Sequence, residues 1–153
     1  MICNTIHLFY NKLQKEVKIP ILNLRGEIKR ELKKRKVKSE FVIGTPLTIN
    51  KNLYKFKEIK YSKPNKKETN QLSEAIFNFN KGKKKKEQIR NVKEICKKYL
   101  KKVDVVILGC TEFAVMLRNE KFPKINTIDV LVNATLKKFI SFKNQGGFNL
   151  TWT

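Results

Sequence analysis

The sequence lacks the features that would assign it at once to a membrane, secreted or metal-binding class. No stretch approaches the ~18 to 20 apolar residues of a membrane span, and the N-terminus has no basic segment followed by an apolar one. The three cysteines show neither the Cys-x-x-Cys nor the Cys/His spacing of a zinc site, and their odd number favours reduced thiols over a disulfide framework. We therefore expect a cytoplasmic protein with no membrane anchor, no signal peptide and no bound metal.

Acidic residues are scarce beside basic ones. The 153 residues include 35 Lys and Arg against 13 Asp and Glu, which gives a formal net charge of +22. Such an excess usually indicates a nucleic-acid partner. Here the lysines are spread over almost the whole chain, and no known nucleic-acid motif or stacking platform of aromatic residues and arginine accompanies them. Binding of nucleic acid or another polyanion by a basic module is therefore the alternative function, and the net charge is the only evidence that supports it.

The pattern of apolar residues predicts strands and helices that alternate along a single domain of ordinary size. An apolar content of 41% is enough for a core of moderate extent. Strands are predicted at 19–24, 40–45, 54–61 and 103–108, and helices at 6–17, 27–36, 72–79, 87–100 and 131–142. This alternation predicts an α/β fold, a parallel sheet with helices on both faces, in which ligands bind at the carboxyl ends of the strands.

Two cysteines lie in similar local settings, each after an apolar strand and before a helix. The first is in Cys3-Asn4-Thr5-Ile6-His7, and the second is in Gly109-Cys110-Thr111-Glu112. At a helix N-terminus, the dipole and the unpaired N–H groups favour the thiolate, so each cysteine could act as a base. Two thiols on opposite sides of a bound amino acid could remove and return its α-proton without a cofactor. The same N–H groups, with the Asn and Thr side chains of these motifs, suit a carboxylate.

These motifs resemble those of the aspartate racemases, a branch of the aspartate/glutamate racemases that work without pyridoxal phosphate. Members of that family carry Cys-Asn-Thr-Ala-His at the end of a strand of the first lobe and Gly-Cys-Thr-Glu in the second. Between the two motifs they have a strand that ends in Gly-Thr with a further threonine, matched here by Gly44, Thr45 and Thr48. Glu112 favours the aspartate branch, because glutamate racemases usually have histidine at that position.

The resemblance implies an isomerase that racemises aspartate or a related acidic amino acid, with no cofactor and no metal. Cys3 and Cys110 would be the acid–base thiols on opposite faces of the substrate. The residues implied in substrate binding are Asn4, Thr5, Thr45, Thr111, Glu112 and, as a weaker match, Lys81. The sequence leaves open which acidic amino acid is the substrate.

Two departures from the family pattern accompany the matches. Family members begin with a complete lobe that carries a glycine-rich loop and a substrate-binding arginine, whereas only Met1-Ile2 precede Cys3 here. On this interpretation residues 1–18 are the end of a truncated first lobe, 19–125 form the second lobe, 126–142 form a helix that returns to the first lobe, and 143–153 are an irregular tail. The aspartate and histidine that members often have near the last helix are replaced by Asn126-Thr127 and Leu131.

Loss of the first lobe would expose apolar residues on the first and last helices. The predicted patch consists of Phe9, Leu13, Leu136, Phe139 and Ile140. Three explanations stay open: a split enzyme whose N-terminal lobe is a separate chain, a remnant with impaired or no activity, and a domain that forms a homodimer. We favour the remnant.

Overall fold

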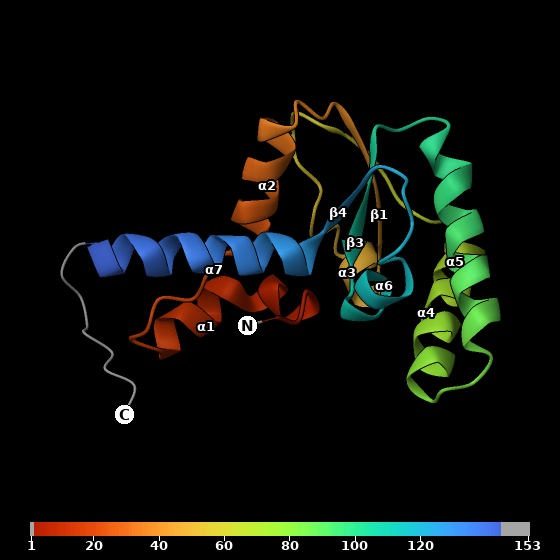
Figure 1. The fold of residues 1–153 in the computed structure, drawn as a ribbon, viewed down its shortest axis with the longest axis horizontal. Coiled ribbons are helices and arrows are strands. Elements are labelled where there is room, and N and C mark those ends of the chain that lie inside the picture. The colour runs from red at the N-terminus through yellow and green to blue at the C-terminus, as the bar shows by residue number, and fades with distance from the viewer. Residues whose placement is uncertain (1, 145–153) are drawn as a thin grey trace.

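A parallel sheet of four strands forms the centre of the molecule (Figure 1). The computed structural model describes residues 2–144. The strand order is β2-β1-β3-β4, and each pair of neighbours is parallel. The strands are β1 (Ser39–Gly44), β2 (Lys60–Ser62), β3 (Val105–Gly109) and β4 (Lys124–Asn126). This confirms the predicted α/β fold with a parallel sheet.

Helices cover both faces of the sheet, as predicted. On one face lie α4 (Lys66–Asn80), α5 (Lys85–Leu100) and the short α6 (Thr111–Met116). On the other face α2 (Leu24–Lys34) packs beside the first turns of α7 (Thr127–Asn144). Three further helical segments lie near the carboxyl edge of the sheet or precede α2: the 3₁₀ helix η1 (Thr5–Phe9), α1 (Tyr10–Glu16) and α3 (Pro46–Asn50).

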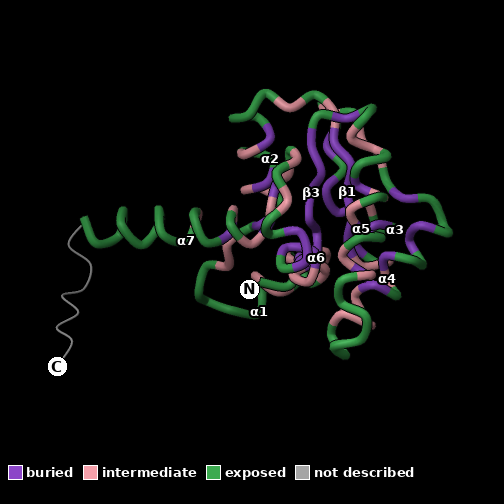
Figure 2. The backbone as a smooth tube through the Cα atoms, turned by 45° about the vertical axis from the view of Figure 1, so that its right-hand side comes forward, coloured by how far each residue is buried: buried purple, intermediate pink, exposed green. Residues whose placement is uncertain are grey.

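The two central strands are buried on both faces, which is typical of an all-parallel sheet (Figure 2). Phe41 and Ile43 of β1 point into the core beneath α4 and α5, and Val42 between them points into the core beneath α2. The ring of Phe41 stacks on that of Tyr99 with 3.8 Å between centroids. The continuous apolar runs of β1 and β3 thus follow from the need to fill two cores at once.

The helical hairpin of α4 and α5 is fixed by one buried carboxylate. Asn65 and Glu68 form a capping box at the start of α4, and this local signal sets where the helix begins. The Glu68 carboxylate also accepts hydrogen bonds from Lys98 Nζ at 2.6 Å and from the Tyr99 hydroxyl at 2.7 Å, both on α5. The hairpin therefore presents the C-terminal end of α4 to the sheet in a defined position.

The structure differs from the predicted elements at two strands and adds two short elements. The predicted strand at 19–24 is wrong, because α2 begins at Leu24 and the Asn23 side chain caps it by accepting from the N–H of Gly26 at 3.0 Å. Of the predicted strand 54–61 only the last residues pair in β2. The elements missed are α3, which begins with Pro46 directly after the capping residue Thr45, and β4.

Helix α7 extends beyond the sheet and is exposed along most of its length (Figure 2). Only Thr127 and Leu131 of this helix are buried. The predicted exposure of apolar residues is confirmed for Phe9, Leu136, Phe139 and Ile140, whereas Leu13 is half-buried. Of the predicted tail, residues 143 and 144 belong to α7 and 145–153 lie outside the described residues. Within residues 2–144, no helix is both long and apolar enough to cross a membrane.

Candidate active site

Seven of the eight predicted site residues line one cleft at the carboxyl edge of the sheet. The cleft has a volume of ≈ 320 Å³, and its lining consists of Ile2, Cys3, Asn4, Thr5, Thr45, Ile76, Gly109, Cys110, Thr111 and Glu112. The eighth predicted residue, Lys81, does not line it, and its Nζ lies 4.1 Å from the centroid of the Phe77 ring. The structure thus brings the two motif cysteines to a single site although 107 positions separate them.

The register of the central strands explains why the cysteine of the second motif meets the Gly-Thr turn. Gly44 and Gly109 are partners at the ends of β1 and β3, so Thr45 and Cys110 follow at the same level. A Cβ added to Gly109 would lie 2.8 Å from the carbonyl oxygen of Ile43, which no side chain could tolerate without a shift. Glycine before Cys110 therefore allows the two strands to approach closely at the floor of the cleft.

Three hydrogen bonds converge on the Glu112 carboxylate. Cys110 Sγ and Thr111 Oγ1 both donate to Oε2, at 2.7 Å and 2.8 Å, and Asn80 Nδ2 donates to Oε1 at 3.0 Å. Burial alone would raise the pKa of Glu112, but the three donated hydrogen bonds outweigh it and lower the pKa to about 2. The carboxylate is therefore charged at neutral pH.

Cys110, which donates to Glu112, is a neutral thiol and not the thiolate that its motif predicts. Burial of the thiol, together with the adjacent Glu112 carboxylate, raises the pKa of Cys110 to about 12. The expectation that the helix dipole favours a thiolate is wrong for this cysteine, because α6 spans only six residues and burial, aided by the Glu112 carboxylate, outweighs it. Cys110 is a neutral thiol that donates its proton towards Glu112.

Hydroxyl contacts hold the N-terminal segment against the turn after β1. Thr5 Oγ1 lies 2.9 Å from Thr45 Oγ1 and 3.0 Å from Thr48 Oγ1, and Thr45 donates to Thr48 at 3.1 Å. These contacts hold the segment that carries Cys3, which is exposed and lines the same cleft as the buried Cys110. The helix that follows Cys3 begins as 3₁₀ rather than as the predicted α-helix.

Four residues of the site were not among the sequence predictions. Asn80 and Ile76 come from α4, Thr48 supports the threonine cluster, and Tyr54 donates a hydrogen bond to Asn4 Oδ1. The sequence did point to Thr48, which matches the threonine that family members have after the Gly-Thr turn, but no role was predicted for it. The others carry no local signal, because each reaches the cleft through tertiary packing. In the described part of the chain, no cluster of three or more His, Cys, Asp or Glu residues could hold a metal ion.

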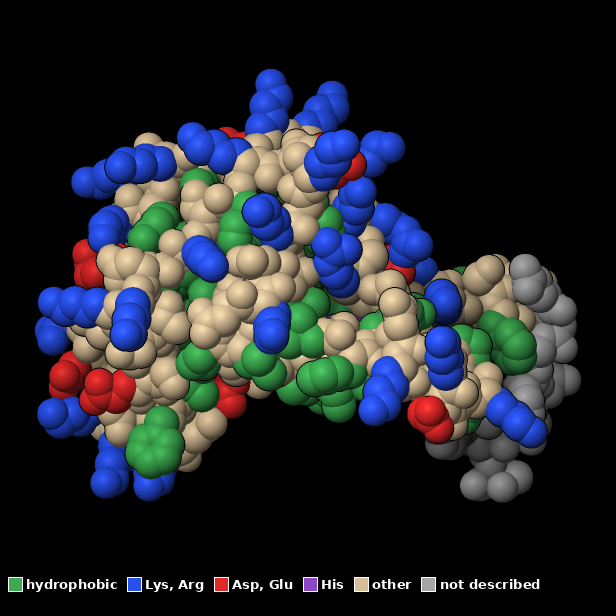
Figure 3. All heavy atoms as spheres, turned by 180° about the vertical axis from the view of Figure 1, so that it is seen from behind, with side chains coloured by type: hydrophobic (Ala, Val, Ile, Leu, Met, Phe, Trp, Pro, Cys, Tyr) green, Lys and Arg blue, Asp and Glu red, His purple; other side chains and the backbone are tan. Residues whose placement is uncertain are grey.

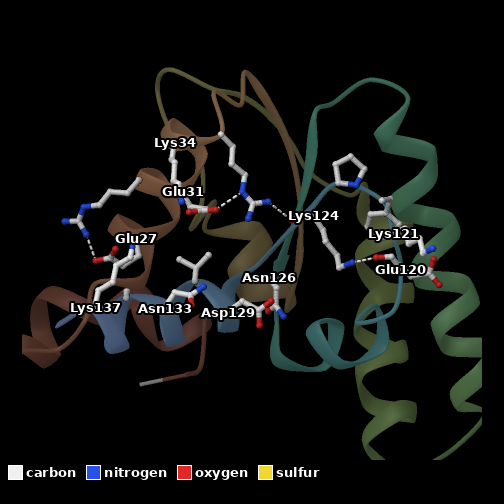
Figure 4. Close-up of a pocket in the computed structure, with 16 residues that line it drawn as sticks. Glu27, Glu31, Lys34, Glu120, Lys121, Lys124, Asn126, Asp129, Asn133 and Lys137 are labelled. Atoms are coloured by element: carbon white, nitrogen blue, oxygen red, sulfur yellow. Dashed lines mark hydrogen bonds and ion pairs between the residues drawn. The ribbon is translucent and has the colours of Figure 1, made fainter. Parts of the chain in front are cut away.

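A larger groove of ≈ 660 Å³ lies on the α2 and α7 side of the molecule (Figure 4). It contains none of the motif residues, and several of its charges are paired within it. Arg35 Nε lies 2.6 Å from Glu31 Oε1, Arg30 pairs with Glu27, and Lys124 Nζ donates to the carbonyl oxygen of Glu120. Its lining residues include no Cys, Ser or Thr, so this groove is a weaker candidate for thiol chemistry than the cleft of the two cysteines.

Comparisons with known proteins identify a matching family model and solved structures of the same fold. A family model described as Asp/Glu/Hydantoin racemase matches residues 1–135. The chain has the fold of an aspartate racemase homologue from Pyrococcus horikoshii OT3, at 24% identity and a TM-score of 0.71, over 88% of this chain and 63% of that one. It also has the fold of the Picrophilus torridus aspartate racemase, at 23% identity and a TM-score of 0.77, over 90% of this chain and 60% of that one. The chain therefore spans less than two thirds of these structures.

Proposed function

This chain belongs to the Asp/Glu/hydantoin racemase family, and we propose that it racemises a small acidic amino acid, aspartate or a close relative, with Cys3 and Cys110 as acid and base. The observation that carries the proposal is that both thiols line one cleft at the carboxyl edge of the sheet, with hydroxyl and amide groups between them. No step of this chemistry calls for a cofactor. The presence of three free cysteines also supports the cytoplasmic location that we propose.

The two thiols differ in a way that suits opposite roles. Cys110 is a neutral thiol at rest, so it can give its proton to one face of a planar α-carbanion. Cys3 acts as the base and takes the α-proton from the other face, and the substrate leaves with inverted configuration. Cys3 is then protonated and Cys110 is a thiolate, and the reverse reaction or proton exchange with solvent restores the first state.

The side chains between the thiols suit a dicarboxylic amino acid. The hydroxyls of Thr5, Thr45 and Thr111 can donate to substrate oxygens, and the buried amide nitrogen Nδ2 of Asn4 has no hydrogen-bond partner among residues 2–144. Glu112 is charged and can accept from the substrate's ammonium group as well as from Cys110. Lys81 does not line the cleft, so we assign it no part in substrate binding.

We further propose that the exposed apolar residues of α7 bind the first lobe of a racemase of this family. Val132, Leu136, Phe139 and Ile140 are all exposed and recur at helical spacing along α7, which makes one apolar stripe. The relatives contain a further portion of chain that this one does not match. Because Cys3 is exposed, the chain without that lobe should racemise more slowly than a complete two-lobed enzyme.

Binding of nucleic acid or another polyanion is the second candidate function. Figure 3 shows Lys and Arg side chains distributed over the whole of the displayed face, with no gathering into one patch or stripe. A distributed charge of this kind gives weak, salt-sensitive attraction to any polyanion, and affinity that falls steeply with salt would identify it. The cleft of the two cysteines is left unexplained by this alternative.

The test is to incubate the chain with L-aspartate in D₂O and to follow both α-deuteration and the formation of D-aspartate. We expect slow deuteration that is lost in the Cys3→Ser/Cys110→Ser double variant and kept in Cys96→Ala, which removes the one thiol outside the cleft. Each single Ser variant should abolish racemisation and leave exchange from one face. The proposal is overturned if neither L-aspartate nor L-glutamate is deuterated, or if deuteration continues unchanged in the double variant.

A further inference from the structure

Asn80 is the last residue of α4 and reaches across to the site from outside both cysteine motifs. Its Nδ2 donates to Oε1 of Glu112 at 3.0 Å, although 32 positions separate the two residues. No feature of the sequence around Asn80 distinguishes it from Asn78, which lies in the same helix and whose side-chain amide donates to Glu74 Oε1 at 3.4 Å. The contact with Glu112 exists because α4 packs against α6 at the carboxyl edge of the sheet.

We propose that Asn80 is a positioning residue that holds the Glu112 carboxylate against the Cys110 thiol and so sets the pH at which this thiol ionises. The catalytic importance of Asn80 rests on the proposed function, whereas its hydrogen bond to Glu112 does not depend on that function. The two carboxylate oxygens of Glu112 are divided between two elements. Oε1 accepts from Asn80 of α4, and Oε2 accepts from Cys110 and Thr111 at the start of α6.

This division of contacts is what keeps the carboxylate in place. Glu112 lies in the first turn of the short helix α6 and is half-buried, and its side chain has rotatable bonds that would allow the carboxylate to turn towards solvent. A hydrogen bond to one oxygen fixes the plane of the group and leaves the other oxygen facing the thiol. The Asn80 amide is neutral, so it does this without cancelling the negative charge that keeps Cys110 protonated.

The other charged and titratable groups near the thiol do not provide this control. Cys3 of the N-terminal segment also acts on Cys110 and raises its pKa, but with a smaller effect than Glu112. Lys81, next to Asn80 in sequence, has its ammonium group over the Phe77 ring. On the α7 side, a neighbouring hollow that Thr111 also lines contains Asp129, Arg118 and Lys124, and none of these three lines the cleft of the cysteines.

Removal of the Asn80 amide should therefore make Cys110 more acidic. Once released, the carboxylate spends part of its time away from Sγ, and the thiol loses both its hydrogen-bond acceptor and the adjacent negative charge. Both losses favour the thiolate. A single hydrogen bond of this kind corresponds to a shift of about half to one pH unit in the ionisation of Cys110.

The experiment measures the rate of alkylation of Cys110 by iodoacetamide as a function of pH. The parent is Cys3→Ser/Cys96→Ala, in which Cys110 is the only thiol and the influence of Cys3 is removed. Asn80→Leu and Asn80→Ala are compared with the matched control Asn78→Leu, and circular dichroism checks that each variant is folded. At a fixed pH below the pKa the rate follows the thiolate fraction of Cys110, so we expect alkylation to be about three- to tenfold faster in both Asn80 variants and unchanged in Asn78→Leu.

The decisive comparison repeats Asn80→Leu in a Glu112→Gln background. Because Asn80 acts through the charge of Glu112, the increase in rate should disappear there, and Glu112→Gln alone should raise the rate by more than Asn80→Leu does. An unchanged or lower alkylation rate in the Asn80 variants, or an equal increase with and without Glu112, overturns the proposal. Alkylation needs no substrate, so a chain that fails to racemise aspartate still gives a clear result for Asn80.

Discussion

The Tyr54 hydroxyl donates a hydrogen bond to Oδ1 of Asn4, and both side chains are buried. The two residues are 50 positions apart, and the contact joins the segment that carries Cys3 to the loop after α3. Burial, with a further contribution from Cys3, raises the pKa of Tyr54 far above its usual range, so its hydroxyl remains a donor at every physiological pH. Because Oδ1 is held in this way, the amide of Asn4 has one orientation, with Nδ2 left for a ligand.

Tyr54→Phe should therefore destabilise the protein by about 1–3 kcal/mol, since it leaves a buried amide oxygen without a donor. Urea unfolding followed by circular dichroism measures the loss. Tyr61→Phe is the matched control: the Tyr61 hydroxyl is also buried but has no hydrogen-bond partner within the described residues, so its removal should change stability little. Equal losses in the two variants would show that the Tyr54 contact contributes nothing specific.

Glu40 predicts a dependence of stability on pH. It lies opposite Tyr61 in the register of β1 and β2, it is buried, and neither of its carboxylate oxygens has a hydrogen-bond partner in the described structure. Burial raises the pKa of Glu40 to about 8, although Arg25 partly offsets the effect. A neutral carboxylic acid can remain in this core, whereas a carboxylate is strongly disfavoured there.

The sign of this dependence follows from the raised pKa. Below about pH 4.5 the group is protonated in both the folded and unfolded states, so the free energy of unfolding has its full value. That free energy should fall as the pH rises and should have lost on the order of 4 kcal/mol once the pH passes about 8. Urea unfolding between pH 4 and pH 9 measures it. Glu40→Gln should remove this loss, the exposed Glu58→Gln should not, and a flat wild-type profile would contradict the assignment.

Thr48→Val should loosen the N-terminal segment. The fully buried Thr48 hydroxyl contacts both Thr5 and Thr45, and valine keeps the shape of the side chain without the hydroxyl. We expect a loss of about 1 kcal/mol and faster hydrogen exchange at residues 4–9, measured by mass spectrometry. Thr135→Val is the control, since that hydroxyl bonds only to the Leu131 carbonyl within α7. Unchanged exchange in Thr48→Val would mean that other contacts hold the segment.

The apolar stripe on α7 should bind the hydrophobic dye ANS, and the double variant Leu136→Glu/Ile140→Glu should reduce the fluorescence at least severalfold. Phe77→Glu, which changes an exposed phenylalanine outside the stripe, should have little effect. Sedimentation velocity over a range of concentrations identifies what covers the stripe in the chain alone. A stable dimer that the double variant abolishes would assign the stripe to a second copy and contradict the proposed first lobe.

The central part of the fold and most of the cleft could be predicted from the sequence. The apolar runs at 40–45 and 103–108 are typical of strands that are buried on both faces of a sheet, and they form β1 and β3. The run at 19–24 is also largely apolar, but it contains Pro20 and its Asn23 caps α2, and the chain is irregular before that helix. Strand β4, with three residues, is too short to leave a periodic signal and forms because β3 provides an edge for it.

The sequence by itself determined which chemical groups are present and where strands end, because turns, caps and the spacing of apolar residues are local properties of the chain. Together with the family resemblance that the two cysteine motifs carry, it predicted one site that contains Cys3, Cys110, Thr5, Thr45 and Thr111. Only the tertiary structure decided how those groups behave. The contact of Asn80 with Glu112, the contact of Tyr54 with Asn4 and the burial of Cys110 join segments distant in sequence, and they depend on strand register and helix packing. Burial and a neighbouring carboxylate are properties of the folded surroundings, which is why Cys110 is a neutral thiol where its local motif predicted a thiolate.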